Sequence, residues 1–169
     1  MDIDLSQKPW WGYIEDDIKE LLREAQLLYD KASAWEEKFH DYAFIVFPAA
    51  KAYEGFLKKL FLDLGFISEN DYYGKRFRIG KALNPSLEAN LRWESVYDRL
   101  VGFCGGPSLA DKLWETWKYS RNLIFHWFPK EKNAITLPEA KDRLGMVIDS
   151  LDAAFKECKI ERQNVQKPV

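Results

Sequence analysis

Residues 118–129 read Lys-Tyr-Ser-Arg-Asn-Leu-Ile-Phe-His-Trp-Phe-Pro, and the rest of the chain is organised around this stretch. Arg121, Asn122 and His126 interrupt an otherwise apolar and aromatic helical pattern. One interpretation is a buried polar pair that is satisfied by hydrogen bonds. The other is a ribonuclease site, in which Arg121 stabilises phosphate charge and His126 transfers protons.

The spacing of these residues indicates how such a site could be assembled. Five residues advance an ideal α-helix by about 140° and about 7.5 Å, so Arg121 and His126 cannot lie side by side on one helix. Asn122 and His126, in contrast, share a face. A second copy of the helix, crossing near a two-fold axis, could bring arginine and histidine of both chains into one groove. A symmetric dimer is therefore part of the ribonuclease hypothesis.

Composition limits the classes of function. The chain has 169 residues, of which 47% are hydrophobic, so we expect one domain with a single core. The net charge is −2, and any RNA site must therefore be local. No apolar run reaches the roughly 20 residues that span a bilayer, and Met1–Ser6 lack the pattern of a signal peptide, so we expect a cytoplasmic protein with no membrane partner.

The metal-ligating residues are few. With two cysteines and two histidines in the chain, we expect no zinc site, no other metal and no cofactor. Cys104 and Cys158 both fall at apolar helical positions, which favours reduced thiols that pack in the core over a disulfide.

Apolar residues recur at helical spacing along most of the chain, with no convincing strand. The five patterns cover residues 15–35, 41–64, 85–104, 108–128 and 137–158, the last opened by a capping box of Thr136 and Glu139. The sequence therefore predicts an all-α bundle of about five helices over residues 14–158. An irregular aromatic segment (1–13) precedes the bundle and a polar tail (159–169) follows it.

Glu54 is the only charged residue in the apolar rows of the second helical pattern. One interpretation is a surface pair with Lys58, one turn further on. A carboxylate in a core-facing stripe otherwise needs a cation, and Arg121 is the natural candidate. Asp41 lies about 220° round an ideal helix from Glu54, so it joins the same site only if the helix kinks at Pro48. The alternative for Asp41 is an N-terminal helix cap.

Residues 66–90, after the second pattern, break the helical spacing, and we expect residues 70–81 to form a glycine-punctuated loop. Cations and aromatic rings follow one another there, which suits single-stranded RNA because cations hold phosphates and rings stack on bases. The candidate RNA-binding residues are Tyr72, Tyr73, Lys75, Arg76, Arg78 and Lys81. The alternative is a solvated loop whose aromatic side chains pack against the core.

These residues resemble the HEPN superfamily, many of whose members are metal-independent RNases that act as dimers. Within it, the chain is most similar to the carboxy-terminal domain of the RnlA/LsoA toxins, RNases that a cognate antitoxin inhibits. The similarity rests on residues 42–48, 53–58, 79–83 and 121–126.

The resemblance implies an endoribonuclease with RNA as substrate, a homodimer and a cognate antitoxin as partner protein. It also implies that an acidic pair, matched here by Asp41 and Glu54, orients Arg121 and His126. Two further functions stay open: a non-catalytic adaptor for dimerisation or RNA binding, and a structural bundle in which Arg121 and Glu54 form a buried ion pair.

Overall fold

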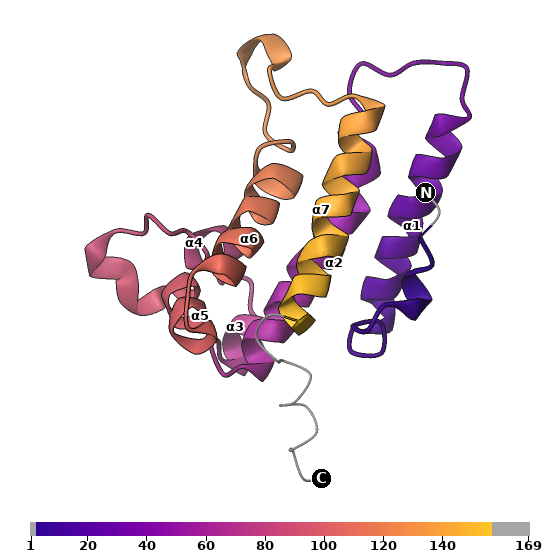
Figure 1. Cartoon of the computed structure of the whole chain (residues 1–169). Helices are drawn as coiled ribbons and strands as arrows, with labels where there is room; N and C mark the ends of the chain where they lie inside the picture. Colours follow the sequence, from indigo (N-terminus) through magenta and orange to yellow (C-terminus); the bar gives the residue numbers. More distant parts are fainter. Residues whose placement is uncertain (1–2, 157–169) are drawn as a thin grey trace.

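Four long helices form the body of the protein. The computed structural model describes residues 3–156, without the side chain of Glu131, and this part of the chain contains helices and no β-strand. The four are α1 (Asp16–Ser33), α2 (Ala43–Asp63), α6 (Ser108–Trp117) and α7 (Leu137–Lys156). Figure 1 shows α2 and α7 at the centre, with α1 and α6 on either side and running in the opposite direction. The predicted all-α class is confirmed.

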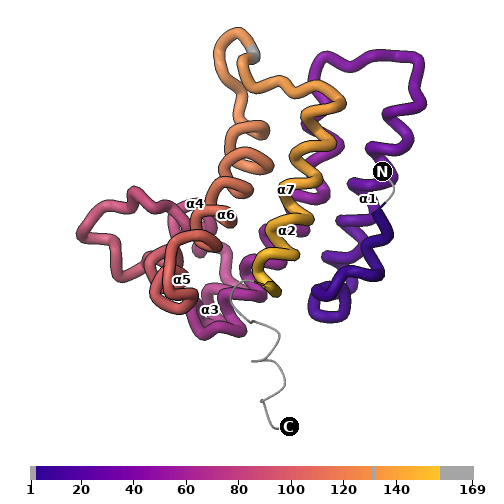
Figure 2. The backbone as a smooth tube through the Cα atoms, viewed as in Figure 1, coloured from indigo at the N-terminus to yellow at the C-terminus, as the bar shows by residue number. Residues whose placement is uncertain are grey.

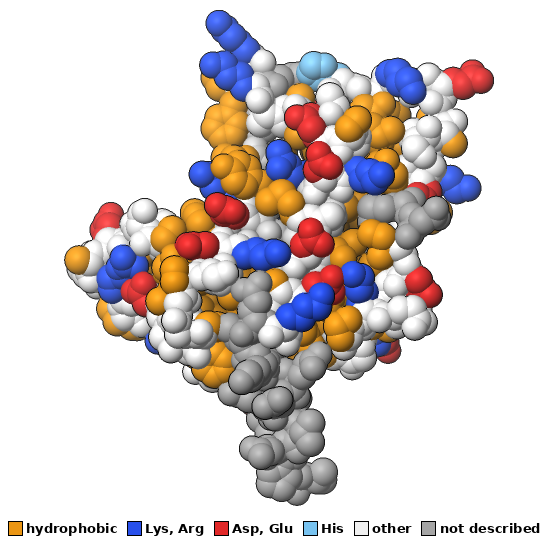
Figure 3. Space-filling view, in the orientation of Figure 1, with side chains coloured by type: hydrophobic (Ala, Val, Ile, Leu, Met, Phe, Trp, Pro, Cys, Tyr) orange, Lys and Arg blue, Asp and Glu red, His pale blue; other side chains and the backbone are white. Residues whose placement is uncertain are grey.

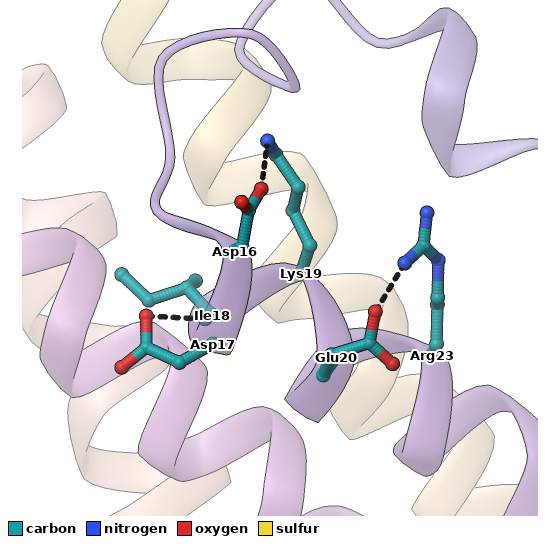
Figure 4. A network of polar contacts seen from close by, with 6 residues as sticks. All are labelled: Asp16, Asp17, Ile18, Lys19, Glu20 and Arg23. Carbon is teal, nitrogen blue, oxygen red and sulfur yellow. Dashed lines mark hydrogen bonds and ion pairs between the residues drawn. The ribbon is translucent and has the colours of Figure 1, made fainter.

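α1 buries one face and exposes the other. Ile18, Leu22 and Ala25 recur at helical spacing and are buried in the core. Its first turns carry charged side chains that pair along the solvent face, as Figure 4 shows: Lys19 with Asp16 at 2.8 Å, and Arg23 with Glu20. Exposed pairs of this kind stabilise a helix only slightly, so the buried face holds α1 in place.

α2 is the central element and is buried on most of its sides. Large side chains along its second half, among them Tyr53, Phe56 and Phe61, are fully buried. The Tyr53 hydroxyl donates a hydrogen bond to the carbonyl of Leu113 in α6 at 2.9 Å, and burial raises the pKa of this phenol. α2 therefore fixes the position of α6, which leads to the stretch that carries Arg121.

A smaller lobe, residues 64–107, connects α2 to α6 and lies to one side of the four long helices (Figure 2). It contains α3 (Glu69–Tyr73), α4 (Ile79–Ala82), the 3-10 helix η2 (Ala89–Glu94) and α5 (Val96–Cys104). The prediction that residues 70–81 form a loop is wrong, because α3 and α4 overlap this range. Both have five residues or fewer, too few for a helical period to show in the sequence.

The predicted helix over 85–104 is two elements. η2 and α5 are separated at Ser95, whose hydroxyl accepts the N–H of Asp98 at 3.0 Å and so caps α5. The expectation of a reduced thiol at Cys104 is wrong, since this residue is disulfide-bonded. Cys158 and the predicted tail lie outside the described residues.

The amino-terminal aromatic segment shares the core of the bundle. It contains a 3-10 helix, η1 (Leu5–Gln7), and Trp10 is fully buried. The indole Nε1 of Trp10 donates to Asp152 Oδ1 at 2.8 Å, and Lys8 pairs with Asp152 Oδ2 at 2.7 Å. Burial alone would raise the pKa of Asp152, but these two partners outweigh burial and lower the pKa below its ordinary value.

Candidate functional site

The α-helix that begins at Ser108 ends earlier than the sequence predicts. After Trp117 the chain makes one π turn, η3 (Lys118–Asn122), closed by a hydrogen bond from the N–H of Leu123 to the carbonyl of Lys118 at 3.0 Å. A turn over residues 123–125 and a bend at His126 follow, and a 3-10 helix, η4 (Pro129–Glu131), comes next. The prediction of one helix as far as residue 128 is therefore wrong. π turns inside helices occur often at functional sites.

Arg121, near the end of this π turn, contacts two side chains, those of Glu54 and Trp117. Its Nη2 lies 3.6 Å from Oε2 of Glu54, so the expected contact between these residues is present. Its guanidinium carbon also lies 5.0 Å from the centre of the Trp117 ring, in a cation–π contact. Glu54 and Trp117 together fix a guanidinium that stays partly open to solvent.

The ion pair lies at the rim of the core. The side chain of Arg121 is 38% exposed and that of Glu54 is 37% exposed, so a carboxylate in the core is not what the structure contains. The face of α2 that carries Glu54 is not buried along its whole length. Phe47, two turns earlier on the same face, is 52% exposed. The surface alternative for Glu54 is also absent, because Lys58 Nζ donates to the carbonyl of Tyr72 at 3.3 Å.

His126 lies beyond the π turn and is exposed. Among the described residues, no hydrogen bond or ion pair reaches its ring. Asn133 holds the surrounding turn, since its side-chain amide donates to the carbonyls of Leu123, at 3.1 Å, and of His126. The prediction that His126 lies in the last turn of a helix is wrong, so the dipole argument for its charge does not apply.

Asn122 is half-buried at the last position of η3. The rule that places residues four apart on one helical face assumes α-helical hydrogen bonding. Because the closing bond here spans five residues, that rule does not put Asn122 beside His126.

Asp41 is a cap. Its Oδ1 accepts the backbone N–H of Ala43 at 2.9 Å and that of Ile135 at 3.1 Å, so it joins the start of α2 to the chain just before α7. Glu54 lies thirteen residues further on, about 20 Å along an ideal helix. The structure therefore does not bring Asp41 together with Glu54 and Arg121, and the helix-cap alternative describes this residue.

Aromatic side chains are exposed around the Arg121 region. Phe47 on α2 packs edge-on against Phe125 at 5.5 Å between ring centres, and Trp127 and Phe128 follow His126 with exposed rings. We call Phe47, Phe125, Trp127 and Phe128 the aromatic rim. Figure 3 shows hydrophobic side chains spread over this face of the protein, with basic and acidic side chains between them at the upper end and below. An exposed apolar surface of this kind is typical of an interaction site.

The six candidate RNA-binding residues separate into two groups. Arg76, Arg78 and Lys81 line a cleft of about 520 Å³ in the lobe, together with residues that the sequence did not single out, chiefly Trp93 and Arg99. These two were missed because they follow the predicted loop in sequence and join it only in space.

The other three residues do not line that cleft. Tyr72 is half-buried, and its hydroxyl donates to Oε1 of Glu15 at 3.1 Å. Burial first, and then this hydrogen bond, raise the pKa of Tyr72 to about 12. Tyr73 packs edge-on against Tyr72 and is exposed, as is Lys75. Tyr72 thus packs partly against the core, as the solvated-loop alternative expects.

Comparisons with known proteins add no assignment: no family model, curated protein or solved structure matches the chain. Within residues 3–156, no group of three or more His, Cys, Asp or Glu side chains is arranged to hold a metal ion. In the same part of the chain, no helix has both the length and the apolar character needed to cross a bilayer. The site is therefore interpreted from its own chemistry.

Proposed function

We propose that the protein is a metal-independent endoribonuclease of the HEPN type, a toxin or defence RNase of the cytoplasm that cleaves single-stranded RNA. The observation that carries the proposal is the half-exposed ion pair of Arg121 and Glu54. Arg121 lies near the end of a π turn, and the chain leads from there to exposed His126. A guanidinium held by a carboxylate and an indole ring, yet open to solvent, suits contact with a phosphate.

The proposed reaction is attack of the ribose 2′-OH on the adjacent phosphate. A bond forms between the 2′-oxygen and phosphorus, and the bond to the 5′-oxygen of the next nucleotide breaks. His126 either removes the 2′-OH proton, with water protonating the leaving 5′-oxygen, or protonates the 5′-oxygen, with water accepting the 2′-OH proton. Arg121 offsets charge on the phosphorane. Glu54 orients Arg121, and Asn122 positions one of these two groups.

The proposal includes a symmetric homodimer. The aromatic rim flanks the turn that carries His126. Because several of its rings are exposed to solvent, we expect another protein surface to cover the rim. A second copy across this surface would supply the second arginine and histidine of the groove. A cognate antitoxin would be the partner protein that inhibits the enzyme.

The test is cleavage of single-stranded RNA by purified protein in excess chelator. We expect cleavage by the wild type and a loss of at least about 100-fold with His126→Ala, the usual contribution of general acid–base catalysis. His40→Ala is the matched control, because His40 is the only other histidine and is also exposed. Absence of cleavage, or equal cleavage by His126→Ala, contradicts the proposal.

The second candidate is a non-catalytic adaptor of the same fold. The observation that favours it is Glu54 itself, which neutralises the guanidinium of Arg121 in a chain of net charge −2. Expression in cells separates the two functions. An enzyme is toxic and becomes harmless as His126→Ala, whereas an adaptor is harmless in both forms.

A further inference from the structure

The lobe of residues 64–107 contains a cleft that the proposed ribonuclease chemistry does not use. Its volume is about 520 Å³, within the range of roughly 300–1,000 Å³ that is common for small-molecule sites. Its walls come from the connection between α2 and α3, from α3, from the connection between α3 and α4, from α4, from η2 and from α5. The side chains that the argument uses are Phe77, Arg76, Arg78, Lys81, Trp93 and Arg99.

The cleft carries unneutralised positive charge. Lys81 is paired with Glu94 at 2.6 Å, and the Asp71 carboxylate, which also lines the cleft, accepts bonds from Ser68. Arg76, Arg78 and Arg99 have no carboxylate within ion-pair distance among residues 3–156. Three guanidiniums around one concave surface indicate an anionic ligand.

Two of these arginines are fixed in place by backbone carbonyls. Arg99 donates to the carbonyl of Phe66 and, at 3.1 Å, to that of Trp93, and so ties two walls of the cleft together. Arg78 donates to the carbonyls of Lys75 and, at 3.2 Å, of Phe77. Each guanidinium has five N–H donors, so both retain donors for a ligand. A site that is fixed before binding loses less entropy when it binds.

An exposed aromatic ring completes the cleft. Trp93 is among the lining residues and is nevertheless 72% exposed, whereas Phe77 is half-buried and packs against the core. An exposed indole beside guanidiniums offers a flat surface for a planar ring. Phosphate and a planar base occur together in a nucleotide.

We propose that this cleft binds a nucleotide, with its phosphate on Arg76 and Arg78 and its base against Trp93. The nucleotide is either free or one unit of an RNA chain, since both present the same phosphate and base. The inference concerns binding alone, so it stands or falls independently of RNA cleavage.

The experiment measures binding of adenosine monophosphate, a tetranucleotide RNA and inorganic phosphate to the full-length His126→Ala protein by calorimetry. This background keeps the RNA intact under the proposed mechanism. Arg76→Ala and Trp93→Ala are the test variants. Lys141→Ala and Phe39→Ala are the controls, because they are an exposed cation and an exposed ring that lie outside the lobe and do not line the cleft.

We expect Arg76→Ala and Trp93→Ala each to weaken nucleotide binding about tenfold, and both controls to stay within about twofold of the parent. Equal affinity for the mononucleotide and the tetranucleotide supports a free ligand, and preference for the tetranucleotide supports RNA. Equal affinity for inorganic phosphate, equal effects of the test and control variants, or no binding of either nucleotide overturns the inference. Circular dichroism of each variant confirms that the fold is retained.

Discussion

Gly80 lies directly against the indole of Trp117. A β-carbon added at position 80 would be 2.9 Å from Nε1 of Trp117, closer than such contacts occur in proteins. The face of the same indole carries the guanidinium of Arg121. Lys81, the next residue in α4, lines the nucleotide cleft. One aromatic ring therefore connects the cleft of the lobe to the arginine of the candidate active site.

Gly80→Ala should destabilise the protein by about 1–3 kcal/mol, because the added methyl group must displace a rigid indole. Gly102→Ala is the control, since Gly102 lies inside α5 with nothing within 4 Å of an added β-carbon. There the change should stabilise the helix by about 0.5–1 kcal/mol. Denaturant unfolding measures both values, and a loss of stability at both positions, or at neither, contradicts the assigned contact.

Asp41→Ala should lower the free energy of unfolding by about 1–3 kcal/mol, because it removes the acceptor of two backbone N–H groups. Asp41→Asn keeps one acceptor oxygen and should lose less. Asp149→Ala, an exposed carboxylate of α7, should change stability by under about 0.5 kcal/mol. If RNA cleavage disappears in Asp41→Asn while stability is kept, Asp41 has a role in catalysis that its position does not suggest.

Arg121 and Glu54 should contribute little to stability. A double-mutant cycle of Arg121→Ala and Glu54→Ala should give a coupling energy of about 0.2–1 kcal/mol, because both side chains are more than one-third exposed. A coupling above about 3 kcal/mol would instead match the structural bundle with a buried pair. The same variants assayed for RNA cleavage show whether the pair serves activity more than folding.

If the aromatic rim is the dimer surface, Trp127→Ser should raise the dissociation constant of the dimer at least tenfold, which corresponds to roughly 1.4 kcal/mol of binding free energy. Trp93→Ser is the matched control, since Trp127 is 74% exposed and Trp93 is similarly exposed on the lobe. Light scattering over a range of protein concentrations measures the dissociation constant. A wild-type protein that stays monomeric throughout removes the dimer from the proposed function.

Asp152 should make the free energy of unfolding depend on pH in the acid range. Its pKa in the folded protein is lowered below the ordinary 3.8 by Lys8 and Trp10, so its contribution is present above that value. The contribution is lost as the pH falls through the lowered pKa. We expect Asp152→Asn to be less stable by about 1–2 kcal/mol at pH 7, and the difference from the wild type to shrink below about pH 4. A difference that is independent of pH contradicts this assignment.

The long helices could be predicted from the sequence because each repeats its apolar spacing over many turns. α1 begins and ends near its predicted limits, and α7 begins at the predicted residue. The capping box of Thr136 and Glu139 is formed, with the backbone nitrogen of Thr136 2.7 Å from the Glu139 carboxylate. α3 and α4 are too short to show a period. Their positions depend on tertiary contacts such as that of Gly80 with Trp117.

The candidate site could be predicted from the sequence only in part. The charge requirement of Glu54 pointed to Arg121, because a carboxylate in an apolar row needs a cation. The surroundings of His126 could not be predicted, since nothing in the local residue pattern distinguishes a π turn from an α-helical turn. The cleft residues Trp93 and Arg99 were also missed, because only the folded lobe places them beside Arg76.

The wide turn at Lys118–Asn122 has a consequence for how this chain is aligned with others. A closing bond over five residues accommodates one residue more than an α-helical turn does. A relative with an unbroken helix here would align only with a one-residue gap inside this stretch. Without that gap, every position after it would be compared with a neighbour about 100° away around the axis, and the histidine would be matched to the wrong partner.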